Sequence, residues 1–369
     1  MKNKATNNQQ KKLKFDRLAI YGWRCTIFLI SLGIGSIIFG KIIPSPEIPV
    51  VTSKLENFTK NKDKYNVVFI GSSKIYRHIV PSEFDKAMER RGKEISSYNF
   101  GVSSMQSLES YFFLKKILAM KPKNLEYIFI ELQNIELSIN RENWRTNRVI
   151  YWHDWEHTFW VFDLILDYQH SLRVKFGALK SHTIPLMYNL GGVGKVDGLI
   201  QWINNQGNQD NITFDRLNNR FMQNDYINGY LPLDQEIGVS YQQRRQNFLG
   251  NLNTYHEKVN LLNLPSDKVV NPNSTLLRVT KDLIQIVKDS DVTPIFMITP
   301  VLQKKENLIA LKTKEYVSTL FLFNNPIEYP RLYAPELRFD KKHLNDKGAR
   351  EFTELLAEKF SEYLDREKN

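Results

Sequence analysis

The sequence contains a single cysteine, Cys25, among its 369 residues. One thiol excludes an intramolecular disulfide and also excludes a thiolate metal cluster such as a zinc ribbon. Scarcity of thiols is compatible with an oxidising compartment. The fold is therefore expected to rest on its apolar core, and a content of 42% hydrophobic and 12% aromatic residues suffices for one large or two small domains.

Acidic residues are nearly absent from the beginning of the chain. Residues 1–45 contain only Asp16 against eight basic residues, which are Lys2, Lys4, Lys11, Lys12, Lys14, Arg17, Arg24 and Lys41. This local charge of +7 (8 − 1) leaves +4 of the total +11 for everything that follows. An excess of basic residues beside an apolar run is typical of a membrane-topology signal rather than of a phosphate-binding face, so no nucleic-acid partner is expected.

Residues 25–40 carry no charge, and the apolar run reaches a membrane-spanning length over residues 18–43. A cleaved signal peptide would need a small-x-small site, which the following FGKIIPSPEIP lacks. A buried core helix would not explain the basic cluster. The positive-inside rule therefore predicts a cytoplasmic tail over 1–17, a single-pass signal anchor over 18–43 and an extracytoplasmic domain over 65–369. Residues 44–64 between them are expected to form a linker that can include one short helix.

Apolar runs of strand length alternate with amphipathic segments in this domain. Strands are expected at Asn66–Ser73, Glu94–Ser104, Leu125–Asn134 and Val292–Pro300, and helices near Pro81–Arg91 and at Ser107–Met120, Ser274–Ser290 and Asn345–Leu364. Strict alternation predicts an α/β fold with a parallel sheet covered by helices on both faces.

The alternation is interrupted between residues 141 and 273, in a stretch rich in Asn, Gln and aromatic residues. This insertion is too long for a simple loop, so it is expected to contain helices of its own and to form a cap or flank near the site. Its aromatic residues between Trp144 and Trp160 suit either the core of such a cap or a platform for sugar or lipid. His153, His157, His170 and His182 lack the spacing of metal ligands, and no metal is expected.

Small and polar residues follow the predicted strands in a fixed order. Gly71-Ser72-Ser73 ends the first strand, Gly101 and Asn134 follow the second and third, and the segment FDKKHLN (339–345) precedes the last helix. These blocks resemble those of the SGNH (GDSL-like) hydrolase superfamily over about residues 65–135 and 275–365. The GSS form is similar to that of membrane-anchored extracellular members, such as teichoic-acid D-alanylation and polysaccharide O-acetylation proteins.

The resemblance implies a flavodoxin-like three-layer sandwich. It implies Ser73 as nucleophile with Asp340 and His343 completing a triad, and an oxyanion hole formed by the N–H groups of Ser73 and Gly101 with the side chain of Asn134. The physical chemistry of these residue types agrees, because ligands of parallel sheets bind at the carboxyl ends of strands. A serine hydroxyl needs an imidazole base, and a carboxylate three residues before the histidine can orient the ring.

Each block also has a structural interpretation. GSS is a common strand-to-helix turn in which Ser72 caps the following helix, and Asn345 or Asp346 is a suitable N-cap for the last helix. Asn134 can be a simple strand-end residue, since the glycine that the family pattern places shortly before it is missing. Ser73 is preferred to Ser72 because Ser73 aligns with the serine of the GDS triplet.

We therefore expect a serine-dependent acyl-ester hydrolase or O-acyltransferase that modifies a cell-surface or exported glycan through an acyl-enzyme. The resemblance implies an acyl donor, a glycan acceptor and a multi-spanning membrane acyltransferase as partners, and no cofactor. Two alternatives stay open, a simple esterase or lipase with the same triad and a catalytically silent scaffold that binds glycan or an assembly complex.

Overall fold

The computed structural model describes residues 20–24, 26–28, 31, 35, 46, 48–195, 228–236, 238–264 and 270–367. The chain divides into two compact units. Unit 1 comprises residues 1–47, 139–159 and 179–210, and unit 2 comprises residues 48–138, 160–178 and 211–369. The division falls within two helices of the insertion, so the insertion contributes to both units.

Unit 2 contains an α/β fold built around five parallel strands, which are β1 (Val67–Gly71), β2 (Ser97–Gly101), β3 (Tyr127–Glu131), β4 (Thr293–Ile298) and β5 (Leu320–Leu322). The strand order is β2-β1-β3-β4-β5. Strand β1 therefore lies between β2 and β3, which is the order of a flavodoxin-like sheet. The predicted α/β class with a parallel sheet is confirmed.

The described helices lie between the strands as expected, and the insertion between β3 and β4 contains several helices of its own. They are α2 (Val51–Asn61), α3 (Ser73–His78), α4 (Pro81–Glu89), α5 (Ser107–Ala119), α6 (Asn147–Trp152), α7 (Trp155–Asp167), α8 (Leu172–Leu190), α12 (Val239–Leu249), α13 (Leu252–Asn263), α14 (Ser274–Lys288), α15 (Glu306–Thr313) and α16 (Asp346–Glu367). Short 3-10 turns are η1 (Lys62–Lys64), η2 (Arg141–Asn143), η3 (Leu233–Gln235), η4 (Pro330–Tyr333) and η5 (Pro335–Leu337).

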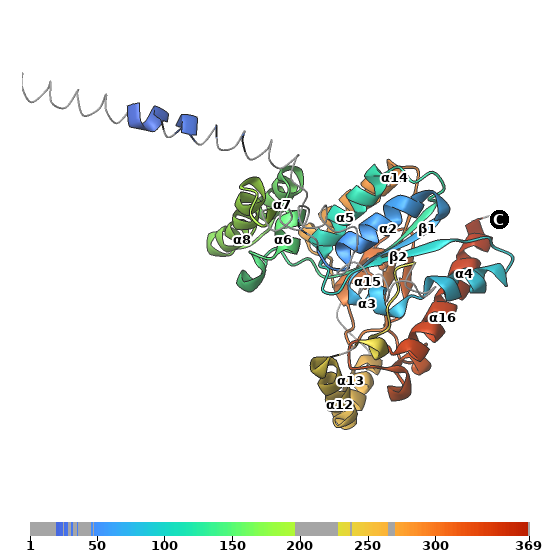
Figure 1. Cartoon of the computed structure of the whole chain (residues 1–369). Coiled ribbons are helices and arrows are strands. Elements are labelled where there is room, and N and C mark those ends of the chain that lie inside the picture. The colour runs from blue at the N-terminus through green and yellow to red at the C-terminus, as the bar shows by residue number, and fades with distance from the viewer. Residues whose placement is uncertain are drawn as a thin grey trace, which may run out of the picture. The chain divides into compact units, whose positions relative to one another are not determined.

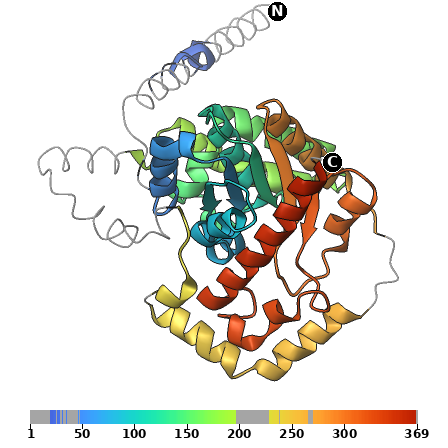
Figure 2. The same cartoon turned by 90° about the vertical axis from the view of Figure 1, so that its right-hand side faces the viewer.

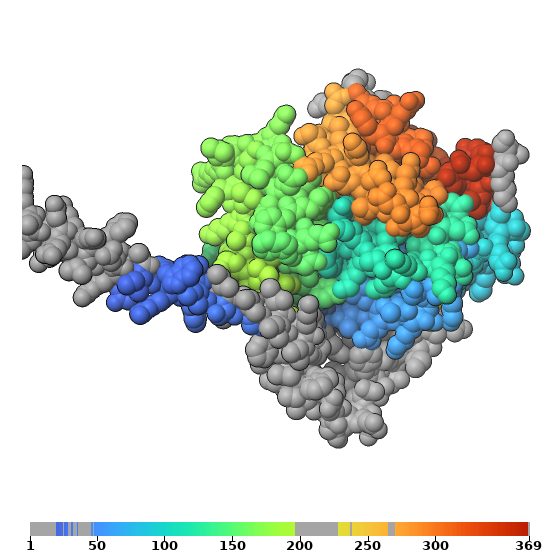
Figure 3. Space-filling model, turned by 90° about the horizontal axis from the view of Figure 1, so that it is seen from above, coloured from blue at the N-terminus to red at the C-terminus, as the bar shows by residue number. Residues whose placement is uncertain are grey.

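Helices cover both faces of the sheet (Figure 1). Strand side chains alternate between the faces, and on one of them Phe69, Phe129 and Phe360 form edge-on and tilted ring contacts within a large core beneath α4 and α16. Figure 2 shows α16, in red, running across this face. The other face carries α2, α5 and α14, which Figure 3 shows in blue, teal and orange. All five residues of β1 are buried, as a central strand of a parallel sheet requires.

The folded unit begins earlier than the expected linker over 44–64 allows. Helix α2 packs on the sheet edge, where Phe58 is fully buried and its ring lies 5.5 Å from that of Tyr98. The apolar spacing of Val51, Leu55 and Phe58 is that of a helix with one buried face. Unit 2 therefore starts at Ile48 rather than at residue 65.

A buried lysine holds a segment of the insertion, at Gly229, against this edge. The ammonium group of Lys54 donates to the backbone oxygens of Asn99 (2.8 Å), Gly101 (2.6 Å) and Gly229 (2.6 Å), and it lies 4.0 Å from the centre of the Tyr76 ring. Burial, and then the charge of Arg77, hold the pKa of Lys54 well below its usual range. The lysine thereby joins three segments that are far apart in the sequence.

Unit 1 contains part of the insertion. Trp152 is buried there beside His153, whose Nε2 lies 2.9 Å from Nδ1 of His182, while Trp155 is exposed. Trp160 belongs to unit 2 and stacks on Tyr111 at 3.9 Å. The aromatic cluster of the insertion thus divides between two cores and an exposed surface.

The predicted tail over 1–17 lies outside the described residues, and so does most of the predicted anchor over 18–43. Residues 20–24, 26–28, 31 and 35 are helical. Within the part of the chain that the structure describes, no helix has both the length and the apolar character needed to span a membrane.

Candidate active site

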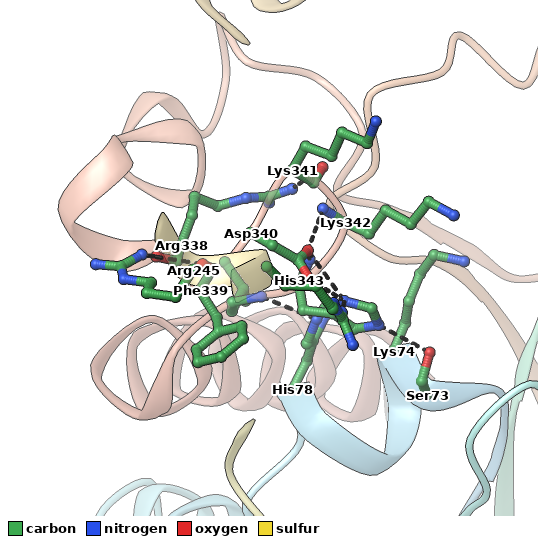
Figure 4. A network of polar contacts seen from close by, with 12 residues as sticks. Ser73, Lys74, His78, Arg245, Arg338, Phe339, Asp340, Lys341, Lys342 and His343 are labelled. Atoms are coloured by element: carbon green, nitrogen blue, oxygen red, sulfur yellow. Dashed lines mark hydrogen bonds and ion pairs between the residues drawn. The ribbon is translucent and has the colours of Figure 1, made fainter. Parts of the chain in front are cut away.

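Ser73 lies where β1 turns into α3. Ser72 caps this helix, because its Oγ accepts a hydrogen bond from the N–H of Lys74 (3.3 Å), and Ser73 is the first helical residue. The structural role expected for Ser72 is therefore observed. The side chain of Ser73 points away from the cap, and its Oγ lies 2.9 Å from Nε2 of His343 (Figure 4).

The segment 338–344 holds His343 by a tight turn. Arg338 and Leu344 form an antiparallel bridge, and the N–H of Phe339 donates to the backbone oxygen of His343 (2.9 Å). The chain just before this turn, at the end of η5, packs directly against α16, since a side chain at Gly348 would meet the backbone oxygen of Leu337 at 2.1 Å. Glycine is required at this close approach.

Asp340 is the orienting carboxylate of this turn. Its Oδ1 accepts from the N–H groups of Lys342 (2.6 Å) and His343 (2.9 Å) and lies 3.1 Å from Nδ1 of His343. Asp340 and His343 are both buried. The order Ser73 Oγ, His343 Nε2, His343 Nδ1, Asp340 is the arrangement in which a carboxylate fixes the ring and a ring nitrogen faces the hydroxyl.

The groups around the pair oppose the effect of burial on the pKa of the carboxylate, whereas on the ring some of them oppose it and others reinforce it. Burial alone would raise the pKa of Asp340, but the hydrogen bond and charge of His343, the N–H of Lys342 and the side chain of Arg244 outweigh it, so the pKa is lowered. Burial lowers the pKa of His343. Asp340 acts in the opposite direction, and the charges of Arg244 and Lys74 lower it further. The imidazole is therefore neutral at pH 7, as a general base must be.

Arg244 is one of the residues of the site that the sequence did not indicate. It lies on α12, about a hundred positions before the turn, and its Nη2 donates to Asp340 Oδ2 and lies 3.2 Å from His343 Nδ1. The adjacent Arg245 donates to the backbone oxygens of Arg338 and Phe339, so α12 braces the turn at two points. No local motif marks such a contact from an insertion.

His78 contacts the turn that carries His343 and helps to hold it in place. Its Nε2 accepts a hydrogen bond from the N–H of Leu344 (3.1 Å), and its ring meets that of His343 edge-on at 5.9 Å. Burial first, and then the charges of His343, Arg338 and Lys74, hold the pKa of His78 well below its usual range. A neutral imidazole is required here, because only an unprotonated nitrogen can accept from a backbone N–H.

Glu131 occupies the carboxyl end of β3 beside the serine. Its Oε2 accepts from the N–H of Ser72 (2.6 Å) and from the side chain of Gln133 (3.2 Å), and its Oε1 lies 3.4 Å from Nζ of Lys74. The carboxylate is buried. It ties the strand-to-helix turn at Ser72 to the neighbouring strand and thereby fixes the backbone next to Ser73.

Gly101 does not have the geometry of an oxyanion donor. Its N–H donates to Oδ1 of Asn99 (2.8 Å), its oxygen accepts from Lys54, and a side chain at this position would meet the backbone nitrogen of Tyr76 at 2.2 Å. Gly101 therefore permits close packing of β2 against α3. Ser104, three residues later, lines the cavity of Ser73 with a left-handed φ of 60°.

Asn134 also lies apart from Ser73. Its backbone oxygen accepts from Ser107 Oγ (3.4 Å), its Oδ1 accepts from Asn307 (3.2 Å), and it lines a neighbouring cavity. The preceding Gln133 lines the cavity of Ser73 instead. The loops beyond β2 and β3 thus present Ser104 and Gln133 where the sequence indicated Gly101 and Asn134.

The triad opens into a cavity of about 950 Å³. Its walls come from α3, the loops after β2 and β3, the turn around Asp340, and helices α12 and α13 of the insertion. The insertion therefore flanks the candidate site, as expected. In the described part of the chain, no cluster of three or more His, Cys, Asp or Glu side chains is placed to hold a metal ion.

Comparison with known proteins does not extend this description. Neither a scan against protein-family models nor a search of curated proteins gives a match to this chain.

Proposed function

We propose that this protein is a serine-dependent acyl-ester hydrolase or O-acyltransferase that acts on a cell-surface or exported glycan. The observation that supports the proposal is the continuous contact from Ser73 Oγ through the ring of His343 to Asp340, at the floor of an open cavity of about 950 Å³. A buried, neutral histidine between a serine and an ionised carboxylate is the arrangement used for nucleophilic acyl transfer.

The mechanism proceeds in two halves. In the first, Nε2 of His343 takes the proton of Ser73 while Oγ attacks the ester carbonyl, and Asp340 stabilises the imidazolium that forms. The tetrahedral intermediate collapses when the imidazolium protonates the leaving alkoxide, which leaves an acyl group on Oγ. In the second half, His343 deprotonates water or an acceptor hydroxyl, whose oxygen attacks the carbonyl of the acyl-enzyme. The second tetrahedral intermediate collapses when the imidazolium of His343 returns the proton to Oγ of Ser73, which releases the free acid or the acylated acceptor and restores the starting state.

The developing oxyanion needs hydrogen-bond donors. The N–H of Ser73 lies in the first turn of α3, where backbone N–H groups have no acceptor within the helix. Ser104 and the amide of Gln133 are further donors along the cavity wall. Because Gly101 donates to Asn99, we propose Ser104 in its place.

The setting of the enzyme follows from the beginning of the chain. We propose a single-pass membrane protein whose folded units lie outside the cytoplasm, because the basic residues of 1–17 precede an uncharged run. Tethering beside the membrane suits transfer to a surface glycan, with a multi-spanning membrane acyltransferase as the source of the acyl group.

The test is covalent labelling of the full-length chain by a fluorophosphonate, which reacts with an activated serine. Ser73→Ala should abolish labelling, whereas Ser72→Ala, which removes only a helix cap, should retain most of it. The reverse pattern would reject Ser73 as nucleophile. An unlabelled but folded wild type would favour the silent scaffold.

A separate sample of wild type that has not been labelled, and whose serine is therefore free, then separates transfer from hydrolysis. Incubation with an acetyl ester should yield an acetylated oligosaccharide when an acceptor is present. If the protein releases acetate to the same extent with and without the oligosaccharide acceptor, it is instead a simple esterase.

A further inference from the structure

A second cavity of about 740 Å³ adjoins the one that contains Ser73. The two share Lys74, Gln106, Gln133, Glu136, Lys258, Lys341 and Lys342 in their linings, so they form one continuous groove that runs from Ser73 towards residues 301–305. An extended chain that crosses the triad therefore has room to continue beyond it. The groove is longer than a small ester requires.

Lysines from four separate parts of the chain line this groove. Lys74 comes from α3, Lys258 from α13, Lys304 and Lys305 from the loop after β4, and Lys341 and Lys342 from the turn that carries Asp340. We call these six residues the lysine groove. Residues so distant in sequence meet only through folding, which distinguishes the groove from a run of charged residues on one exposed helix.

Most of this charge is not neutralised by the protein. Lys74 pairs with Glu131, and Arg244, which also lines the groove, pairs with Asp340. Among the described residues, Lys258, Lys305, Lys341 and Lys342 form no ion pair. Among the lining residues that the structure describes, Glu136 is the one further carboxylate, and it accepts a hydrogen bond from Gln106 (3.2 Å). The groove therefore carries a net positive charge.

Lys305 shows that these charges converge. It is half-buried with a left-handed φ of 56°, and its pKa is lowered by burial first and then by the charge of Lys74, although Glu131 and Glu136 act in the opposite direction. A cation held near another cation and partly removed from water is stabilised when an anion binds.

We infer that the lysine groove binds a glycan polymer carrying carboxylate or phosphate groups, and that it presents one ester or hydroxyl of that polymer to Ser73. The role of Ser73 rests on the proposed function, but binding by the groove does not. The apolar and aromatic lining is confined to buried Phe248 and Tyr255 and to aliphatic side chains. The described lining thus offers no exposed ring for stacking of nucleic-acid bases.

The experiment measures binding without turnover. Full-length Ser73→Ala protein in detergent is titrated into fluorescent oligogalacturonate, oligomeric poly(glycerol phosphate) and neutral maltohexaose. At least one of the two anionic oligomers should bind. Its affinity should fall as the salt concentration is raised from about 50 mM, because salt screens the exposed charges. Whether the carboxylate or the phosphate oligomer binds more tightly identifies the anionic group. Equal binding of neutral maltohexaose would overturn the inference.

Variants locate the binding. An exposed ion pair contributes between about 1.5- and fivefold in affinity, so replacing Lys258, Lys341 and Lys342 together by Gln should weaken binding roughly tenfold. The matched control replaces Lys60, Lys281 and Lys288, which are exposed and lie outside the lining of both cavities, and it removes the same net charge. Equal losses in the two triple variants would show non-specific attraction and overturn the inference.

A single variant covers the case in which the triple variant fails to fold. Lys258 belongs to α13 and not to the turn of Asp340. The variant Lys258→Gln should by itself weaken oligomer binding at least 1.5-fold. Vesicles of anionic phospholipid form a separate arm, and a protein that binds them but neither oligomer would overturn the glycan in favour of a lipid surface.

Serine labelling of the wild type keeps the two proposals separate. Serine labelling without oligomer binding would reject polymer binding by the lysine groove and leave the proposed catalytic function in place. Oligomer binding without labelling would support the groove and reject the catalytic function.

Discussion

At the scale of single residues, the candidate site depends on a histidine that is held between two partners. Asp340 and His343 are joined by side-chain and backbone hydrogen bonds, so neither is positioned independently of the other. Ser73 reaches only the far side of the ring. A chain of contacts of this kind is expected to fail as a unit when one member is removed.

We predict that the effects of His343→Ala and Asp340→Ala on ester turnover do not add. Loss of the base should lower kcat by roughly 10³-fold or more, and loss of the carboxylate by less, because oxyanion stabilisation persists. The double variant should be little worse than His343→Ala in steady-state kinetics. Additive losses would mean that the two residues work separately, and near-normal turnover by folded His343→Ala would exclude the triad.

Arg244 gives a second prediction, which concerns pH. His343 must be unprotonated to act as base, so kcat/KM should fall on the acidic side with a midpoint below 6.5, the ordinary pKa of histidine. The positive charge of Arg244 lowers the pKa of His343. Arg244→Gln removes this charge, so the pKa should rise and the acidic limb should move to higher pH.

The control for this prediction is Lys288→Gln, which removes one exposed positive charge from α14. Its acidic limb should coincide with that of the wild type. If Arg244→Gln left the limb in place or moved it to lower pH, Arg244 would act on the structure of α12 rather than on the charge of the histidine.

At the scale of helices and strands, the sequence predicts what is continuous and apolar and misses what is short or polar. The strands β1, β2, β3 and β4 lie within their predicted ranges, because a buried parallel strand leaves an unbroken apolar run. Strand β5 was not predicted, since three residues give too little pattern. Helix α2 lies in the predicted linker, where one short helix was expected, but its packing on the sheet was not predicted because its few apolar residues are spaced among polar ones.

The site shows the same limit. The positions of Ser73, Asp340 and His343 follow from one strand end and one local turn, and the structure brings these three together. Beyond β2 and β3, the loop conformation decides which residue faces the cavity, and no sequence pattern encodes that choice. The sequence therefore indicated Gly101 and Asn134, whereas Ser104 and Gln133 line the cavity.

The inclusion of α2 in the folded unit has a measurable consequence. Phe58 is fully buried against Tyr65 and Tyr98, so Phe58→Ala should lower the free energy of unfolding by about 3–5 kcal/mol through lost burial and the cavity that remains. Lys60 is an exposed residue of the same helix, so Lys60→Ala should change the free energy of unfolding by less than about 0.5 kcal/mol. Chemical denaturation followed by circular dichroism measures both changes. Equal effects of the two substitutions would mean that α2 belongs to the linker and not to the folded unit.

At the scale of the whole molecule, the first 45 residues and the rest of the chain differ in net charge, and we propose a different role for the positive charge of each part. The beginning carries +7 over 45 residues next to an uncharged run, and the remainder carries only +4. In unit 2, six lysines from separate parts of the chain line the groove at the candidate site. The proposed membrane topology and the proposed binding of an anionic substrate together account for a basic isoelectric point without a nucleic-acid partner.

The topology prediction tests the first of these purposes in cells that carry tags at both termini. If the uncharged run spans the membrane with residues 1–17 in the cytoplasm, protease added to spheroplasts should remove the C-terminal tag and leave the N-terminal tag on a short fragment. Replacing the basic residues among 1–17 by Gln removes the orienting charge, so a fraction of the chains should then insert in the opposite direction and keep the C-terminal tag. Detergent lysis should expose both tags in every case, which shows that protection comes from the membrane. Protection of both tags of the unmodified sequence before lysis would contradict the proposed orientation, and an acyltransferase reaction on surface glycans would then lose its physical access to the substrate.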